Sequence, residues 1–248
     1  MPSEIICQDT TTLSRIAAEL MHSAIVRAMA TRGVARVALS GGSTPREAYR
    51  LLGALPFDRD KTRWFWVDER SVPPDSARSN FALARDELLL PAGISPQRIF
   101  RMEAEREPII QAASAYCELL LNEFELTAPR ALELDEAGRS PLALDLVVAG
   151  IGPDGHTASL FPGTGAALRE DNLVVAVTPS GGLEPRLSLS RPVLVGAHRL
   201  LVLCTGREKR AAVAASRSRG SEDQVPARIY QRARPGTATL LLDRDAAD

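Results

Sequence analysis

A histidine and an aspartate occur close together in the glycine-rich stretch 150–160, and both residue types can take part in acid–base catalysis. His156 is one of three histidines in the chain, and Asp154 precedes it by two positions. A carboxylate beside an imidazole can fix its tautomer or raise its basicity. Because a single histidine is more often structural than catalytic, the residues alone leave both roles open for His156.

The same stretch contains the spacing GxGxxG, which starts at Gly150 and includes Gly152. With two acidic residues about twenty positions further on, it formally matches a dinucleotide-binding fingerprint. We expect no dinucleotide here, because Pro153 removes a backbone N–H from the turn. In addition, the sequence Phe-Pro-Gly at 161–163 interrupts the helix that such a site needs.

A second glycine-rich stretch, residues 40–45, has the sequence SGGSTP and follows an apolar run. Its two glycines let the backbone come close to a ligand, and the hydroxyls of Ser43 and Thr44 add hydrogen-bond donors. Pro45 suits the first turn of a helix, and the N–H groups at a helix N-terminus bind phosphate. The stretch therefore favours a phosphate site, with an ordinary capped turn as the alternative. It is not a P-loop, because GxxxxGK followed by Ser or Thr is absent.

Arginines at two positions are candidates for holding an anion. Arg70 ends the charged triplet that begins at Asp68, directly after an apolar run. Such a triplet is typical of a solvated loop, but a guanidinium at this point can bind phosphate or carboxylate through two parallel hydrogen bonds. Arg186 lies in the segment EPRLSLS and is the second candidate.

Lysine is rare in this chain, whose 30 basic residues comprise 28 arginines and only Lys61 and Lys209. Lys209 follows an apolar run and the sequence TGRE, which places it in the first turn of a predicted helix. A solvated helix face would explain it, but a lysine kept in an arginine-rich chain favours a compact ammonium that binds phosphate. Lys61 has no assigned role.

The elements that must position these residues alternate along the chain. Short apolar, β-branched runs predict strands at residues 34–39, 63–67, 144–149, 173–178, 200–204 and 239–242. Apolar residues at helical spacing predict helices at residues 11–30, 46–55, 79–90, 105–126 and 208–217, the first of them capped by a threonine run and the third by Ser or Asn. Residues 127–141 are interpreted as a loop.

This alternation predicts a doubly wound α/β fold, with a mostly parallel, Rossmann-like sheet covered by helices on both faces. We expect residues 1–248 to form a single domain, since 248 residues can bury one large core. In an open α/β sheet, ligands bind beyond the carboxyl ends of the strands. The loops described above all follow predicted strands.

Composition excludes several classes of protein. With 45% hydrophobic and 25% charged residues, the chain is neither disordered, collagenous nor a disulfide scaffold. Its net charge of −1 provides no field for binding nucleic acid or an anionic membrane surface. No apolar run approaches the length of about 18 residues that suggests a membrane span.

The three cysteines, Cys7, Cys117 and Cys204, are far apart and show no metal-ligand spacing. We interpret them as buried free thiols in a reducing compartment. Residues 1–13 contain two acidic side chains and no apolar core of a secretory signal. A cytoplasmic location is therefore expected.

Taken together, these blocks resemble the 6-phosphogluconolactonase family. The resemblance is carried by SGGSTP at 40–45, DER at 68–70 with VP at 72–73, GIGPDGHTASLFP at 150–162, PR at 185–186 before Ser188, and TG at 205–206 before Lys209. The blocks occur in the family's order and span nearly the whole chain.

The resemblance implies hydrolysis of 6-phospho-D-glucono-1,5-lactone in the oxidative pentose phosphate pathway, without a metal or an organic cofactor. It also implies a small-molecule sugar-phosphate substrate, no nucleic-acid or membrane partner, and a monomer or weak homodimer. Its implied base is His156, with Asp154 beside it. The candidate residues for binding phosphate and sugar are Gly41, Gly42, Ser43, Thr44, Asp68, Arg70, Gly152, Arg186 and Lys209.

Two other functions remain open. Glucosamine-6-phosphate deaminases are similar to this chain in the SGGSTP and DGH blocks, but they typically follow the histidine with a segment resembling IAFNEP. This chain has TASLFP at 157–162 and so lacks the acid that ring opening would need. A non-catalytic sugar-phosphate sensor is the second alternative, although no helix-turn-helix pattern or basic patch suggests DNA binding.

Overall fold

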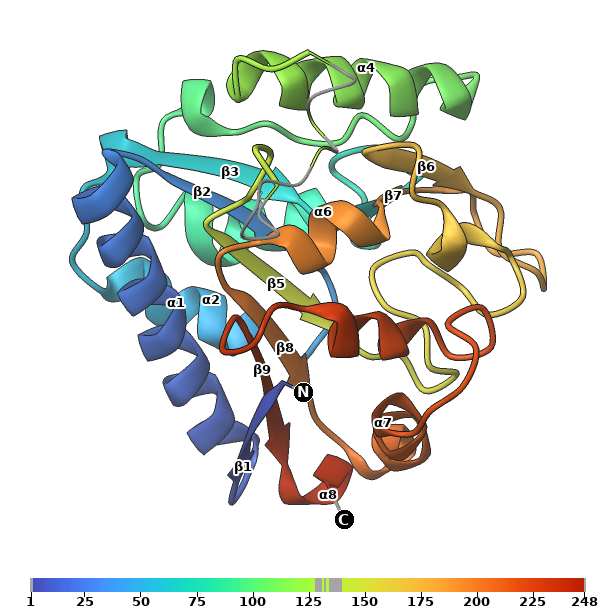
Figure 1. Cartoon of the computed structure of the whole chain (residues 1–248). Coiled ribbons are helices and arrows are strands. Elements are labelled where there is room, and N and C mark those ends of the chain that lie inside the picture. Colours follow the sequence, from blue (N-terminus) through green and yellow to red (C-terminus); the bar gives the residue numbers. More distant parts are fainter. Residues whose placement is uncertain (1, 128–130, 132, 134–139, 248) are drawn as a thin grey trace.

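A parallel sheet of six strands forms the centre of the computed structural model, which describes residues 2–127, 131, 133 and 140–247 (Figure 1). The spatial order of the strands is β1-β9-β8-β5-β2-β3, and every neighbouring pair is parallel. Their bounds are Ser3–Cys7 (β1), Ala35–Leu39 (β2), Thr62–Trp66 (β3), Leu146–Gly150 (β5), Leu200–Cys204 (β8) and Ala238–Asp243 (β9).

The direction of winding changes between β2 and β5. From β2 the chain continues to β3 on one side, whereas β5 lies on the other side of β2 and is followed outward by β8, β9 and β1. At such a switch point the loops leaving the two central strands diverge and open a crevice at their carboxyl ends. The loops that diverge here are residues 40–45 and 151–156, the two glycine-rich stretches.

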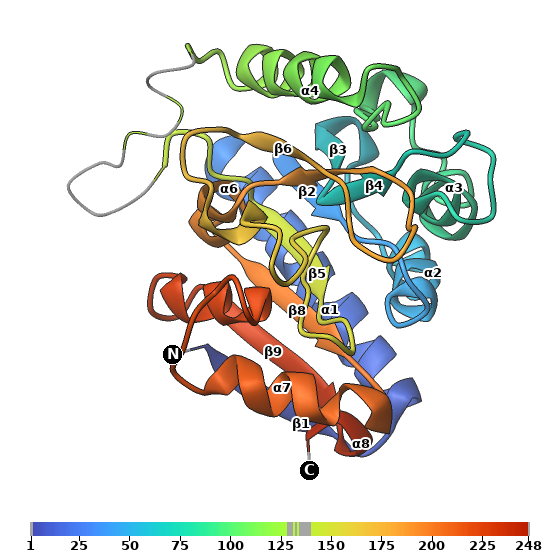
Figure 2. The ribbon, with the colours of Figure 1, turned by 90° about the vertical axis from the view of Figure 1, so that its right-hand side faces the viewer.

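Helices cover both faces of this sheet, as Figures 1 and 2 show. Helices α1 and α2 pack together on one face, and α6, α7 and the 3₁₀ helix η6 lie on the other. Their bounds are Thr10–Arg32 (α1), Arg46–Ala54 (α2), Arg191–Gly196 (α6), Arg210–Arg217 (α7) and Pro226–Arg232 (η6). The predicted doubly wound α/β fold is thereby confirmed.

A second, antiparallel sheet of three strands, in the order β4-β7-β6, was not predicted. It consists of β4 (Asp68–Arg70), β7 (Arg186–Leu189) and β6 (Val174–Val177), and α4 (Ile109–Glu123) packs against it at the top of Figure 2. The interpretation of residues 68–70 as a solvated loop is wrong. Asp68 and Glu69 are buried because this short strand pairs with β7, and pairing between distant segments leaves no local sequence signal.

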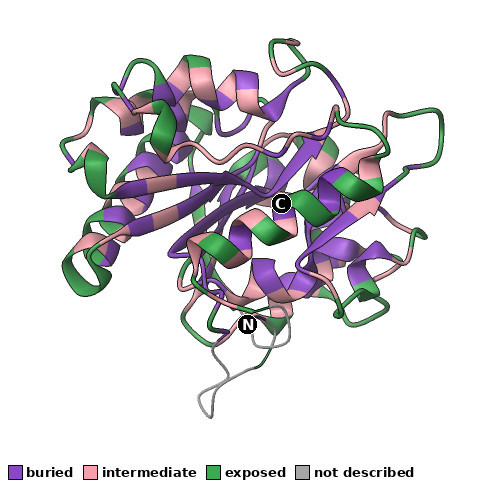
Figure 3. Ribbon diagram, turned by 90° about the horizontal axis from the view of Figure 1, so that it is seen from above, coloured by how far each residue is buried: buried purple, intermediate pink, exposed green. Residues whose placement is uncertain are grey.

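The core lies where the strands meet the helices, and Figure 3 shows the central strands almost entirely buried. All five residues of β8 are buried, as expected for a strand covered on both faces. The largest fully buried side chains include Trp64, Trp66, Tyr49 and Tyr230. Outside the strands, the green exposed positions in Figure 3 lie on the outer sides of helices and on loops.

Most predicted element bounds hold to within a few residues, with informative exceptions at the ends of helices. Asp9, rather than the threonine run, caps α1: its carboxylate accepts a hydrogen bond from Thr12 N at 2.7 Å, and the threonines form the first turn. The helix predicted at residues 79–90 is capped by Ser79 but divides into α3 (Asn80–Ala84) and a π-helical turn at Arg85–Leu89. The last helix, α8 (Arg244–Ala247), was not predicted.

The loop assigned to residues 127–141 lies largely outside the described residues.

Candidate active site

A cavity of about 200 Å³ opens at the carboxyl edge of the central sheet, at the switch point between β2 and β5. Segments from both sheets and from the start of α3 contribute to it. Its lining comprises Ser40, Gly41, Gly42, Asp68, Arg70, Asn80, Gly150, Ile151, Gly152, Pro153, His156, Ala158, Arg186 and Lys209. The fold therefore brings most of the residues singled out in the sequence into one cavity.

His156 and Asp154 form a direct pair at this cavity. The Nδ1 atom of His156 lies 2.6 Å from Oδ1 of Asp154, and the same oxygen accepts the backbone N–H of His156 at 3.0 Å. This hydrogen bonding from His156 lowers the pKa of the Asp154 carboxyl below its usual value. The carboxylate occupies Nδ1, so Nε2 is the ring nitrogen left for chemistry.

The surroundings of the imidazole explain two further residues of the loop. A Cβ at Gly152 would overlap the ring of His156, so only glycine allows the backbone to pass this close. On another side, the ring of Phe161 lies 4.6 Å from the imidazole, centroid to centroid. The guanidinium of Arg186 lies over the same phenyl ring at 5.5 Å. Phe161 thus packs against both the candidate base and a candidate anion ligand.

Arg70 and Arg186 are brought together by the register of the second sheet, in which they stand directly opposite each other on β4 and β7. Like charges at opposed positions destabilise a sheet. Burial, followed by the charge of Arg70, lowers the pKa of Arg186 below its usual value. In both arginines Nε is buried without a hydrogen-bond partner in the described structure. Arg186 has one acidic partner, Glu184, whose Oε2 lies 3.7 Å from Nη2. An anion in the cavity would supply the hydrogen-bond partner that both Nε atoms lack.

Asp68 lies in the cavity wall, but other protein groups already bond its carboxylate. Oδ2 accepts a hydrogen bond from the hydroxyl of Ser159 at 2.7 Å, and Oδ1 accepts one from Nδ2 of Asn80 at 3.2 Å. The Asn80 side chain also lies against Gly41, where a Cβ would overlap its amide. Sequence reasoning missed Asn80 and Ser159, because their contacts with Asp68 join separate segments of the chain. It also missed the role of Phe161, which lies only five positions from His156 but whose ring contact is not signalled by any residue pattern.

Glu69 was treated only as part of a charged triplet, and its carboxylate has a structural role. It accepts hydrogen bonds from the backbone N–H groups of Asn80 and Phe81, both at 2.8 Å, and from the Ser79 hydroxyl at 2.9 Å. Burial raises the pKa of Glu69, and these hydrogen bonds oppose the shift. The carboxylate fixes the start of α3 against β4, next to Arg70.

The 40–45 loop is only partly a cavity wall. Gly41 and Gly42 line the cavity, whereas Ser43 is exposed outside it and Thr44 is buried, with its hydroxyl 2.9 Å from that of Thr205. Tyr49 fixes the beginning of the loop, since its hydroxyl donates to the carbonyl of Ser40 at 2.8 Å. Thr44 therefore connects this loop to the segment after β8 that leads to Lys209.

Lys209 reaches the same cavity from beyond the carboxyl end of β8, where it is the last residue of the 3₁₀ turn Arg207–Lys209 and stands immediately before α7. It is half-buried. By contrast, Lys61 is exposed and lies 3.4 Å from Asp58, away from the cavity lining. The two lysines of the chain thus occupy quite different environments.

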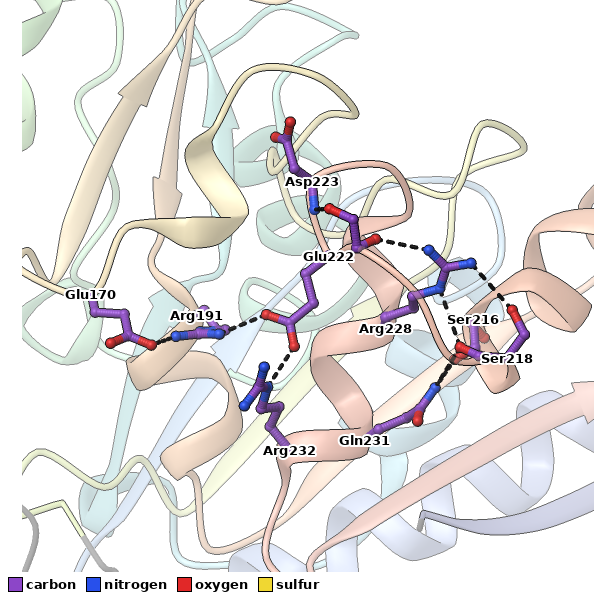
Figure 4. A network of polar contacts seen from close by, with 10 residues as sticks. Glu170, Arg191, Ser216, Ser218, Glu222, Asp223, Arg228, Gln231 and Arg232 are labelled. Atoms are coloured by element: carbon purple, nitrogen blue, oxygen red, sulfur yellow. Dashed lines mark hydrogen bonds and ion pairs between the residues drawn. The ribbon is translucent and has the colours of Figure 1, made fainter.

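Figure 4 shows a polar network that includes residues of η6 and of the segment before it. Arg191 lies between Glu170 and Glu222, and Glu222 also accepts a hydrogen bond from Arg232 at 2.5 Å. Burial alone would raise the pKa of Glu222, but hydrogen bonds from these arginines outweigh it and leave the pKa lowered. Nearby, Arg228 and Gln231 bond backbone carbonyls of the segment that precedes η6.

This network matters to the site because η6 is bonded directly to the loop that follows β5. The backbone N–H of Ala227 donates to the carbonyl of Gly155 at 2.9 Å, and the hydroxyl of Tyr230 donates to the carbonyl of Gly150 at 3.2 Å. Tyr230 also contacts the buried hydroxyl of Thr157. The residues on both sides of His156 are therefore held by a segment about 75 positions away in the sequence.

Within residues 2–127, 131, 133 and 140–247, no group of three or more His, Cys, Asp or Glu side chains is arranged to hold a metal ion. No helix follows the glycines of residues 150–155, where only the short 3₁₀ turn Ala166–Leu168 occurs before β6. The helix N-terminus that a dinucleotide site would require is therefore missing from this loop. Over the same described residues, no helix is long and apolar enough to cross a membrane.

The fold and the cavity define a class of protein, the doubly wound α/β proteins with a ligand crevice at the topological switch point. Comparison with known proteins narrows this class. The sequence model of the family described as glucosamine-6-phosphate isomerases/6-phosphogluconolactonase matches residues 8–240. The chain belongs to this family.

Individual relatives agree with this assignment. The chain is 34% identical over 204 residues to a 6-phosphogluconolactonase of Treponema pallidum, covering 81% of this chain and 80% of the relative. It is 33% identical to a 6-phosphogluconolactonase of a Nostoc species, covering 97% and 95%. Among solved structures, the 6-phosphogluconolactonase of Trypanosoma brucei superposes with a TM-score of 0.85 at 29% identity, covering 100% of this chain and 98% of the other.

Proposed function

We propose that this protein is a 6-phosphogluconolactonase, which hydrolyses 6-phospho-D-glucono-1,5-lactone to 6-phospho-D-gluconate. The observation that carries the proposal is the His156–Asp154 pair, joined at 2.6 Å beside a cavity that Arg70, Arg186 and Lys209 also line. Relatives of that name at 33–34% identity over most of the chain support the same substrate. One arrangement thus combines a base with cations suited to a phosphate ester.

In the proposed reaction His156 acts first as a base and then as an acid. Its Nε2 accepts a proton from water as the water oxygen bonds to C1 of the lactone, and the carbonyl oxygen takes up the negative charge. When this tetrahedral intermediate collapses, the bond from C1 to the ring oxygen breaks. The ring oxygen then receives the proton from Nε2, so that the free imidazole is restored and a carboxylic acid and a hydroxyl are formed.

Asp154 holds the imidazole in the tautomer that this sequence of steps requires. Its carboxylate accepts the Nδ1 proton, which leaves the lone pair on Nε2. The lowered pKa of Asp154 keeps the carboxylate charged, and that charge stabilises the imidazolium formed during the attack. The intermediate's oxyanion needs donors nearby, for which the cavity offers guanidinium groups and the backbone of Gly41 and Gly42.

The cations bind the phosphate and so fix the orientation of the sugar. Buried, unpartnered Nε atoms of Arg70 and Arg186 are suited to phosphate oxygens, and Lys209 adds a point charge. Anchoring one end of the substrate makes the attack at its other end effectively intramolecular. Asp68, Gly152 and the 41–44 loop shape the remaining wall.

A glucosamine-6-phosphate deaminase remains the alternative within the same family. The acid expected in the IAFNEP-like segment of those enzymes corresponds to Phe161, whose ring packs on His156. A phenyl ring cannot transfer a proton, so this contact favours the lactonase. A non-catalytic sensor would not need the Asp154–His156 hydrogen bond that fixes a tautomer.

The deciding experiment measures proton release from freshly generated 6-phosphogluconolactone, alongside ammonia release from glucosamine 6-phosphate. We expect the wild-type protein to accelerate only the first reaction. His156→Ala should lower kcat by about a hundredfold or more while retaining phosphosugar binding. His22→Ala is the matched control, because the His22 ring bonds the carbonyl of Pro56 and does not line the cavity. Undiminished turnover in His156→Ala would remove it as the base.

We also propose that residues 1–248 form one domain, active in the cytoplasm as a monomer or weak homodimer without a nucleic-acid or membrane partner. The near-zero net charge of −1 and the six parallel strands drawn from the whole length of the chain support this. Sedimentation of the purified protein, with and without added DNA, tests both the mass and the absence of a nucleic-acid partner. A stable complex of higher mass would contradict the proposal.

A further inference from the structure

A second polar pocket lies at the opposite edge of the central sheet, where β8 and β9 begin. Its mouth has a volume of about 240 Å³ and includes four arginine side chains, Arg27, Arg32, Arg199 and Arg234. It continues into an inner cavity of about 200 Å³, with which it shares Ala24, Arg27, Arg199 and Thr237. We call the two together the distal pocket, because they lie at the amino ends of β8 and β9, whereas the catalytic cavity lies at the carboxyl ends of the strands.

The charge in the distal pocket is strongly unbalanced. No Asp or Glu of the described chain lines either part of it. Arg32 is bonded to the buried carboxylate of Asp145, which also accepts the backbone N–H of Arg36 at 2.7 Å. This leaves Arg27, Arg199 and Arg234 without an acidic partner among the described residues. Converging guanidinium groups repel one another unless an anion joins them.

Arg234 provides an independent sign of a missing ligand. Its Nε atom is buried and has no hydrogen-bond partner in the described structure, although the residue as a whole is half-buried. Leaving a buried charged donor without a partner is unfavourable, because the group has lost its hydration and gained no hydrogen bond in exchange. Arg199, by contrast, donates to the carbonyl of Gly236 at 2.5 Å.

Stabilisation of a helix terminus does not account for this arrangement. Cations near the last turn of α1 interact favourably with the carbonyls exposed there, and this explains Arg32. Arg199 precedes β8 and Arg234 follows η6, so two of the four arginines come from other elements. Arginines from three segments that are far apart in the sequence therefore line the same part of the distal pocket.

The residues that line the inner cavity indicate what the rest of the ligand molecule, beyond its anionic group, would be. Half of its ten lining residues are apolar, namely Leu20, Ala24, Leu146, Leu200 and Leu201, and the others carry hydroxyl or guanidinium groups. A free inorganic anion would leave this space unfilled, whereas an apolar or aromatic group attached to the anion would fill it. A site with an apolar interior and a few well-placed charges is typical of small organic ligands.

We propose that the distal pocket binds an organic phosphate, with its phosphate held by Arg27, Arg199 and Arg234 and its apolar body in the inner cavity. Such a ligand would bind at the edge of the sheet opposite the catalytic cavity. It would therefore be an effector or an accessory ligand, not a substrate of His156.

Phenyl phosphate is a suitable probe because it joins a phosphate dianion to an aromatic ring. Binding is measured by calorimetry in an Arg70→Ala/Arg186→Ala/Lys209→Ala background, which removes all three cations that line the catalytic cavity. We expect one site per chain in this background. Adding Arg199→Gln and Arg234→Gln should weaken binding by about tenfold or more. Inorganic phosphate should bind less tightly than phenyl phosphate.

Arg27→Gln and Arg15→Gln form a matched pair on α1. Both residues are exposed, but the side chain of Arg27 lines the distal pocket, whereas that of Arg15 pairs with Glu19 at 2.8 Å and lies outside the pocket. Only Arg27→Gln should weaken binding, and it makes no side-chain bond that folding could depend on within the described residues. Lactonase activity of each variant with an intact catalytic cavity reports correct folding. Absence of binding in the background protein, unchanged binding in Arg27→Gln, or equal affinity for inorganic phosphate would each overturn the proposal.

Discussion

The imidazole of His156 is constrained on several sides by residues of its own loop. Asp154 holds Nδ1, Phe161 packs on the ring, and the absence of a side chain at Gly152 leaves room for it. Each contact arises within the ten residues 152–161, so most of the candidate base's environment is local. This is why the 150–162 block carried so much information before the fold was known.

The position of Lys209, unlike that of His156, is not set by contacts within its own loop. It depends on where β8 and α7 lie in the fold. We predict that Lys209→Ala raises KM by about tenfold and lowers kcat much less, since a phosphate anchor contributes similarly to substrate and transition-state binding. Steady-state kinetics on freshly prepared lactone measures both constants. Lys61→Ala, which removes the chain's other lysine, should change neither constant. An unaltered KM in Lys209→Ala would exclude a phosphate contact.

At the scale of elements, the second sheet positions the two arginines that we propose as phosphate ligands. Antiparallel pairing of β4 with β7 sets Arg70 opposite Arg186, at a cost to stability that a substrate would offset. The same short strand buries Glu69, which fixes α3, and brings Asp68 to Ser159 and Asn80. Function here depends on a strand of only three residues.

We predict that Arg186→Met stabilises the protein while impairing activity. Removing one of two opposed, partly desolvated cations should raise the free energy of unfolding by about 0.5–1 kcal/mol. In the same variant KM should rise by about tenfold or more, because a phosphate ligand is lost. Chemical denaturation and steady-state kinetics test the two parts.

Arg217→Met is the control for this prediction. Arg217 makes two hydrogen bonds with Glu4, at 2.8 and 2.9 Å, and is not opposed by another cation in a sheet pair among the described residues. Its replacement should lower stability slightly and leave KM unchanged. Equal loss of stability in both variants would show that the Arg70–Arg186 pair carries no strain.

At the scale of the whole molecule, the helices on both faces of the sheet exclude water from the strands. One consequence concerns the cysteines, all of which are free thiols. The expected burial is confirmed for Cys7 and Cys204, whereas Cys117 is half-buried. Burial raises the pKa of the Cys204 thiol to about 11. At neutral pH this thiol is protonated and unreactive.

The raised pKa of Cys204 predicts how stability depends on pH. Between about pH 9 and pH 11 the thiol ionises in the unfolded chain but stays protonated in the folded one, so its contribution is complete below pH 9 and is lost as pH rises to 11. A shift of about two units corresponds to a loss of about 3 kcal/mol. The free energy of unfolding, measured by chemical denaturation at several pH values in this range, should fall less steeply with pH for Cys204→Ala than for wild type. An equal pH dependence of stability in the two proteins would show that burial does not raise the pKa of this thiol.

The sequence by itself determined the alternation of strands and helices, the two-residue spacing of Asp154 and His156, and the loops at the carboxyl ends of strands. These features depend on side-chain periodicity, on residue spacing and on the rule that parallel strands end at one edge. Only the tertiary structure decided that Arg70 faces Arg186, that Asp68 meets Ser159 and that η6 supports the histidine loop. Each of these contacts joins surfaces whose register or packing is fixed by the assembled core rather than by neighbouring residues in the chain.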